Sequence, residues 1–302
     1  MAHKETISSL GLALDRHPAW IRHHVKVLEA AGLVALVEER TTRNYTEKFY
    51  RACSPAFTVS MLLRPEPGTD RPVVALASHD FAMELLSDES ASGPGLVTGV
   101  AGSLDSLIGV RQGLADIAGC HLLDSQTGEY NVPFARHLFP DRDVVVVTLA
   151  HREQGLIVTQ GNPLGLTALA DIAERHARFV NRNRGSGTRL WLDHHLAASG
   201  VPFTEIVGFD HEVTTHTEAA AAIAAGTADA AVGIRAAADQ RGLGFVPLFR
   251  ERYDLVIPKD VYETEDVERV LDRLHGKTFR HAVDNMTGYD AHSTGDEYRI
   301  AV

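Results

Sequence analysis

The feature that most constrains the fold is the alternation of short apolar runs with helix-like segments over residues 72–302. Apolar runs such as PVVALAS, GLVTGVAG, DVVVVTLA and GLIVT are interspersed with amphipathic stretches, the last of which is TEDVERVLDRL. Short, nearly continuous apolar strands that alternate with helices are typical of buried parallel sheets with helices on their faces. The sequence therefore predicts an α/β fold for this region.

A short pattern occurs twice within the region, once around Gly113 and once around Gly226. Each copy has an aliphatic residue, two spacers, Gly, one spacer, Ala-Asp, one spacer and Ala, as in VRQGLADIA and IAAGTADAA. The pattern describes a helix that ends in glycine before a buried strand. Its repetition predicts two similar α/β lobes.

Length and charge narrow the class of protein. A chain of 302 residues can form two domains, and a net charge of -11 argues against non-specific nucleic-acid binding by the whole molecule. No apolar run is long enough to span a membrane and no signal peptide precedes the chain, so we expect a cytoplasmic protein without a membrane partner. Cys53 and Cys120 stand outside any CxxC spacing, and no metal site or cofactor is predicted.

Residues 1–63 read as a separate unit. The segments ETISSLGLALD and PAWIRHHVKVLEAAG predict two helices, the second of which places Ile21, Val25 and Leu28 on its inward face. Two strand-like runs, LVALVEE and YTEKFYRA, follow and are joined by the basic RTTRN. The proline-rich residues 64–71 are expected to be a linker to the domain at 72–302.

The phrase IRHHVKVLEAAGLV resembles the recognition helix and following strand of ArsR-like winged-helix regulators. Members of that family carry further helices before this unit, so either the unit is trimmed or the start of the chain is incomplete. The resemblance implies a small winged helix-turn-helix that binds DNA. The implied contacts are Arg22, His23 and Lys26 on the helix, with Arg40 and Arg43 at the hairpin tip.

Residues 184–189, RGSGTR, form a small polar segment just before a helix-like run. Gly185 and Gly187 permit backbone angles that let successive N–H groups converge, and Ser186 and Thr188 add hydroxyl donors. A helix N-terminus with such donors is suited to bind an oxyanion. The arginines that surround it add positive charge and are Arg182, Arg184 and Arg189.

Together with VTTHTEAAAAIAAGTADAAVGI and FVPLFRERYDLVIP, this segment resembles the type II periplasmic-binding-protein fold. It is more narrowly similar to the cytoplasmic version in molybdate- or tungstate-linked regulators. The resemblance implies a bilobed domain with lobe one at about 72–150 and 256–302, lobe two at about 151–255, and the ligand between them. Besides the RGSGTR residues, the implied ligand contacts are Ser78, His79, Gly102, Ser103, Thr215, His216 and Tyr253.

The combined hypothesis is a ligand-responsive transcriptional regulator that senses a small oxyanion, molybdate or tungstate being favoured. Its expected partners are DNA, the oxyanion and a second copy of the chain, because a two-fold operator needs paired recognition helices. No Ser-His-Asp order, paired carboxylate or Walker motif indicates an enzyme. Two alternatives stay open: a protein of molybdenum-cofactor or phosphoester metabolism, and the solute-binding protein of a transporter.

Overall fold

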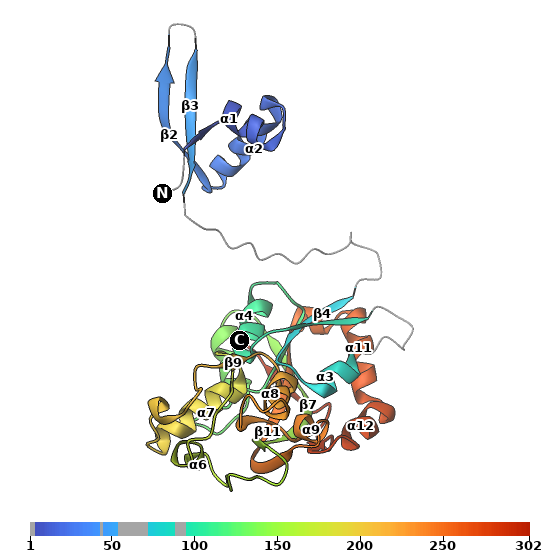
Figure 1. Ribbon diagram of the computed structural model, residues 1–302. Helices are drawn as coiled ribbons and strands as arrows, with labels where there is room; N and C mark the ends of the chain where they lie inside the picture. Colours follow the sequence, from blue (N-terminus) through green and yellow to red (C-terminus); the bar gives the residue numbers. More distant parts are fainter. Residues whose placement is uncertain (1–3, 43–44, 54–71, 88–94) are drawn as a thin grey trace. The chain divides into compact units, whose positions relative to one another are not determined.

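The computed structural model describes residues 4–42, 45–53, 72–87 and 95–302. The chain forms two compact units, Met1–Met61 and Leu62–Val302, which we call the N-terminal and C-terminal units (Figure 1). The expected linker at 64–71 and the expected DNA contact Arg43 lie outside the described residues. Within the described residues, no helix has both the length and the apolar character that a membrane span requires.

The N-terminal unit contains two helices and a three-stranded antiparallel sheet of order β1-β3-β2. Thr6 starts the first helix by accepting a hydrogen bond from the backbone N–H of Ser9, and Pro18 occupies the first position of the second. The elements are β1 (Glu5–Thr6), α1 (Ile7–Leu14), α2 (Pro18–Ala30), β2 (Val34–Thr41) and β3 (Thr46–Ala52).

One expectation for this unit is wrong. Ile21 and Val25 are buried against Tyr50, but Leu28 is 38% exposed. Leu28 instead lines an apolar surface hollow of about 480 Å³ together with Leu14 and Trp20. Among the described residues, the buried apolar core of this unit consists of only three side chains, so it is too small to cover both flanks of the two helices.

The C-terminal unit is built on a mixed sheet of order β10-β7-β11-β6-β4-β5, with β12 and β13 also paired to β7. Among the described strands of this sheet, the parallel pairs are β4–β5 and β4–β6 and the other pairs are antiparallel, so the sheet is mixed and not the parallel sheet that the sequence predicted. The strands are β4 (Val73–Ala77), β5 (Leu96–Val100), β6 (Ile117–Cys120), β7 (Val144–Val158), β10 (Ala230–Ile234), β11 (Gly244–Pro258), β12 (Tyr289–Asp290) and β13 (Glu297–Ile300), and a separate pair is formed by β8 (Asn181–Arg182) and β9 (Glu212–Val213).

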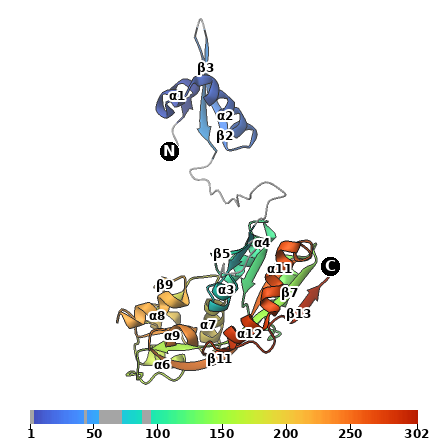
Figure 2. The same cartoon turned by 90° about the vertical axis from the view of Figure 1, so that its right-hand side faces the viewer.

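Two long antiparallel strands, β7 and β11, connect the two halves of the C-terminal unit. The sequence predicted two strands, DVVVVTLA and GLIVT, where the structure has the single strand β7, because the charged residues between them stay in the ladder. We call the half with β4, β5, β6 and β13 lobe one, and the half with β8, β9 and β10 lobe two (Figure 2).

Helices cover both lobes. Lobe one carries α3 (Phe81–Leu86), α4 (Ser103–Arg111), α5 (Val132–Leu138), α10 (Lys259–Tyr262), α11 (Glu265–His275) and α12 (Lys277–Asp284). Lobe two carries α6 (Ala170–Glu174), α7 (Gly187–Ala198), a short 3-10 turn (Phe203–Glu205), α8 (His216–Ala224) and α9 (Arg235–Asp239). The sequence did not predict α5 or α12.

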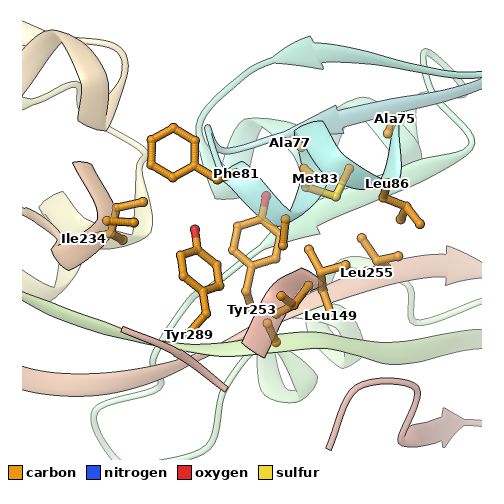
Figure 3. Close-up of a cluster of buried hydrophobic side chains, with 14 of the residues drawn as sticks. Ala75, Ala77, Phe81, Met83, Leu86, Leu149, Ile234, Tyr253, Leu255 and Tyr289 are labelled. Carbon is orange, nitrogen blue, oxygen red and sulfur yellow. The ribbon is translucent and has the colours of Figure 1, made fainter. Parts of the chain in front are cut away.

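The largest apolar core extends from lobe one into lobe two. It contains Phe81 and Met83 of α3, Leu255 of β11 and Ile234 of β10, and Figure 3 shows Phe81 and Ile234 side by side near Tyr289. A core shared in this way packs residues of both lobes together beside the groups that lie between them.

Candidate functional site

The lobes meet where polar ends of several elements converge. Strands β4 and β6 of lobe one end just before Ser78 and His121, and α4 starts just after β5. From lobe two, α7 and α8 begin at the same junction, where the backbone N–H of Leu104 donates to the carbonyl of Gly185 at 3.2 Å. The carboxyl ends of parallel strands and the N-termini of helices are both favourable places for an anionic ligand.

Gly187 permits this close approach. A Cβ atom at position 187 would lie 2.3 Å from the carbonyl oxygen of His121 and 2.6 Å from its Nδ1, so any side chain there would force the lobes apart. The RGSGTR segment therefore places the start of α7 directly against the end of β6, as the glycine spacing allows.

A group of buried polar residues fills this junction. We call it the interlobe cluster, and it consists of Ser78, His79, Asp80, His121, Arg152, Arg182, His216 and Glu251. Seven of these residues are at most 3% exposed, and the side chain of His79 is 9% exposed. In such a setting, ionised groups interact strongly because water does not screen them.

Arg152, in the middle of β7, pairs with both carboxylates of the cluster. Its guanidinium forms ion pairs with Asp80 of lobe one and Glu251 of β11. Burial opposes ionisation of Glu251, but Arg152 and His121 outweigh it and lower the pKa of Glu251 to about 2. Tyr289 also donates to Asp80 at 2.6 Å. Glu251 is therefore ionised, and both carboxylates are already paired with Arg152.

Arg182 differs from Arg152 because no carboxylate pairs with it among the described residues. Its Nη2 donates to the carbonyl of Thr214 at 2.8 Å, while Nε and Nη1 are buried without a hydrogen-bond partner in the described part of the chain. Burial, followed by repulsion from Arg152, lowers the pKa of Arg182 to about 9. This side chain carries a buried positive charge, and its Nε and Nη1 donors are free to bind a ligand.

Two histidines beside Arg182, His79 and His216, also have buried nitrogens without a hydrogen-bond partner among the described residues. These are both ring nitrogens of His216 and the Nδ1 of His79. The two rings lie 6.1 Å apart between centroids. Burial and then Arg182 lower the pKa of His79 to about 4, and the same two causes hold the pKa of His216 well below its usual value. Both rings are neutral near pH 7 and lie beside an arginine that makes no ion pair with a described residue.

The arginines predicted around the RGSGTR segment take three different positions. Arg182 lies in the interlobe cluster. The side chain of Arg184 is 79% exposed and lies 3.6 Å from Glu212, which removes it from the cluster. Arg189 is buried in the wall of lobe two, where it pairs with Asp193 and Glu212.

The predicted hydroxyls take part in local hydrogen bonds, in which Ser103, Ser186 and Thr215 accept from backbone N–H groups. Ser186 and Thr215 cap α7 and α8, and Thr188 bonds with Gln154 at 2.9 Å. Ser103 accepts from the backbone N–H of His121, and Tyr253 donates to the carbonyl of Ser78 at 2.7 Å. Gly102, Gly185 and Gly187 contribute close backbone contacts. The structure thus brings Ser78, His79, Arg182 and His216 together in the cluster, with the other residues supporting its walls.

Three important residues were missed by the sequence analysis: His121, Arg152 and Glu251. Arg152 and Glu251 lie within HREQ and RERYD, charged stretches inside otherwise apolar strands. Charged residues flanked on both sides by apolar strand residues indicate a buried ion pair, because a charged side chain needs a partner when it is buried. An unpaired Asp80 would repel an anion, but its carboxylate is paired with Arg152.

The donor set of the cluster suits an anion and not a metal ion. Within the described part of the chain, its unpartnered groups are Nη2 of Arg152, Nε and Nη1 of Arg182 and the imidazole nitrogens of His79 and His216, while its carboxylates are held by Arg152. No group of three or more His, Cys, Asp or Glu side chains in the described residues is placed to hold a metal. Chemically, the arrangement can receive an oxyanion through charge-assisted hydrogen bonds.

Replacing Arg152 by methionine is expected to lower the free energy of unfolding by about 3–5 kcal/mol at pH 7, because Asp80 and Glu251 would remain buried without their partner. Urea denaturation measures the change. The control is Arg142→Met, whose ion pair with Asp260 is exposed and should contribute at most about 1 kcal/mol. Equal losses in the two variants would contradict this role of Arg152.

Comparisons with known proteins agree with this architecture. Residues 86–275 match the PBP superfamily domain. An uncharacterized protein of Bacillus subtilis, YvgK, is 33% identical over 227 residues, which cover 74% of this chain and 73% of YvgK.

Two solved structures share the fold. One is a phosphate ABC transporter substrate-binding protein with bound phosphate from Clostridium perfringens, 14% identical with a TM-score of 0.56 over 73% of this chain and 99% of that one. The other is the tungstate ABC transporter from Geobacter sulfurreducens, 11% identical with a TM-score of 0.52 over 71% of this chain and 98% of that one. With its two lobes and the two strands that join them, the chain belongs to the PBP superfamily.

Proposed function

We propose that the C-terminal unit is a solute-binding module that holds a small tetrahedral oxyanion between its lobes. The observation that carries the proposal is Arg182, a buried guanidinium with two donors that no described residue accepts. His216 and His79 lie beside it, and α4, α7 and α8 begin at the same junction. An anion there would receive charge-assisted hydrogen bonds. It would also offset the positive charge that, after burial, lowers the pKa values of His79, Arg182 and His216.

The proposed ligand class includes the molybdate and tungstate that the sequence favours, and also phosphate. The two proteins of similar fold are a phosphate and a tungstate transport protein. The proposal for this chain rests on its own hydrogen-bond donors. A ligand that contacts both lobes would stabilise the closed arrangement, because only that arrangement brings all the donors together.

Arg182→Met should weaken binding of phosphate, molybdate and tungstate by roughly 10- to 100-fold, since it removes a charge and two donors. Isothermal titration calorimetry measures the affinity. Arg184→Met is the matched control and should bind as the wild type does, because its side chain points to solvent. Wild-type protein that binds none of these anions, or equal affinities in the two variants, would refute the proposal.

We also propose that the N-terminal unit binds DNA, which would make the protein a ligand-responsive regulator. The supporting observation is the two-sided character of α2, in which Ile21 and Val25 are buried while Arg22, His23 and Lys26 are exposed. Arg22 and Lys26 line a hollow of about 460 Å³ together with Lys48 of β3. Arg40 of β2 is also exposed, although Glu38 pairs with it. A basic helix face beside a hairpin is suited to a DNA groove and its phosphates.

Fluorescence anisotropy with DNA from upstream of the protein's own gene, in low salt, tests this second proposal. The double variant Arg22→Ala/Lys26→Ala in the full chain should bind at least about tenfold more weakly, because it removes two groove contacts. Arg51→Ala is the control, since Arg51 is exposed but lines the apolar hollow with Leu28. The absence of wild-type binding, or an equal loss in the control, would contradict DNA recognition by this face.

A further inference from the structure

Within the interlobe cluster, three buried side chains form a chain of hydrogen bonds. Glu251 lies 2.8 Å from Nδ1 of His121, and Nε2 of His121 lies 3.2 Å from the hydroxyl of Ser78. All three residues are at most 2% exposed. The direction of each bond follows from which group must accept.

Glu251 fixes the first bond. Its carboxylate is ionised, since it pairs with Arg152 and also receives a bond from Gln154, so it can only accept. Nδ1 of His121 must therefore carry the proton. His121 is neutral because burial lowers its pKa, with Arg152 and Arg182 opposing the effect of Glu251. Nε2 is then unprotonated and can only accept.

The second bond follows from the first. With Nε2 of His121 as acceptor, the hydroxyl of Ser78 must be the donor, and its single hydrogen is used in this bond. What Ser78 can still offer is its oxygen lone pairs. A fully ionised oxyanion has only acceptors and gains nothing from such a group, whereas an anion that carries a proton can donate to it.

We propose that the Glu251–His121–Ser78 chain makes Ser78 a hydrogen-bond acceptor in the anion site, so that the site selects a protonated tetrahedral anion, hydrogen phosphate, over fully ionised sulfate, molybdate and tungstate. This inference rests on the proposed function and narrows its ligand class away from the molybdate and tungstate that the sequence favours. Arg182 supplies the attraction for negative charge, the neutral ring of His216 can add one N–H donor, and Ser78 supplies the discrimination. A fully ionised anion would place one of its oxygens, an acceptor, against the Ser78 oxygen, also an acceptor, and this unmatched contact in a buried site weakens its binding.

Calorimetry at pH 7 with phosphate, sulfate and molybdate tests the proposal on the full chain. Wild-type protein should bind phosphate roughly tenfold or more tightly than sulfate or molybdate, the ratio expected from one unmatched buried hydrogen bond. Ser78→Ala should reduce this preference to about threefold or less, because the acceptor is gone. Ser106→Ala, which removes a buried hydroxyl that bonds Gly102 within α4, should keep the wild-type preference.

Several outcomes would overturn the inference. If sulfate or molybdate binds as tightly as phosphate, the selectivity is refuted while oxyanion binding at Arg182 still stands. If no anion binds, the proposed function is refuted as well. A preference unchanged in Ser78→Ala would show that another group discriminates. Hydrolysis of p-nitrophenyl phosphate that is lost in Ser78→Ala would identify Ser78 as a nucleophile, since Ser, His and Glu in this order also occur in hydrolases.

A second measurement does not depend on any variant folding. Nitrogen-15 NMR of the His121 ring in wild-type protein should show the tautomer with its proton on Nδ1 and a bare Nε2. A proton on Nε2 would reverse the bond to Ser78 and free its hydroxyl hydrogen for the ligand, which would overturn the proposal.

Discussion

The buried pairing of Arg152 with Asp80 and Glu251 is the interaction on which the rest of the C-terminal unit depends. It joins three elements, because Asp80 starts α3 in lobe one while Arg152 and Glu251 face each other from the two long strands β7 and β11. It also satisfies both carboxylates of the interlobe cluster. Since neither carboxylate is left for Arg182, a second buried arginine remains with donors directed at the junction of the lobes.

The same pairing determines the hydrogen bonds around it. An ionised Glu251 sets the tautomer of His121, and His121 in turn sets the direction of the bond to Ser78. One side of the junction is therefore rich in donors, at Arg182 and His216, and one position offers an acceptor. A binding site of this kind can distinguish anions of similar size by their protons, which shape and charge alone do not achieve.

Much of the fold could be predicted from the sequence, because strand and helix periodicity and the glycine-closed repeat are local patterns. The start of α7 could be predicted from the RGSGTR segment for the same reason. What could not be predicted depends on contacts between distant residues. The HREQ stretch looked like a break between strands because its partner Glu251 is about a hundred residues away in the chain, and the different positions of Arg184 and Arg189 depend on Glu212.

The central claim is that the interlobe cluster receives an anion beside Arg182, the arginine that no described carboxylate pairs with. NMR titration of the His79 ring, with and without saturating phosphate, tests it directly. Without ligand, the pKa of His79 is held at about 4, chiefly by burial and by Arg182. A bound anion offsets that positive charge and favours the protonated ring, so the pKa of His79 should rise on binding. A pKa that stays unchanged or falls when phosphate is saturating would contradict an anion site in the cluster.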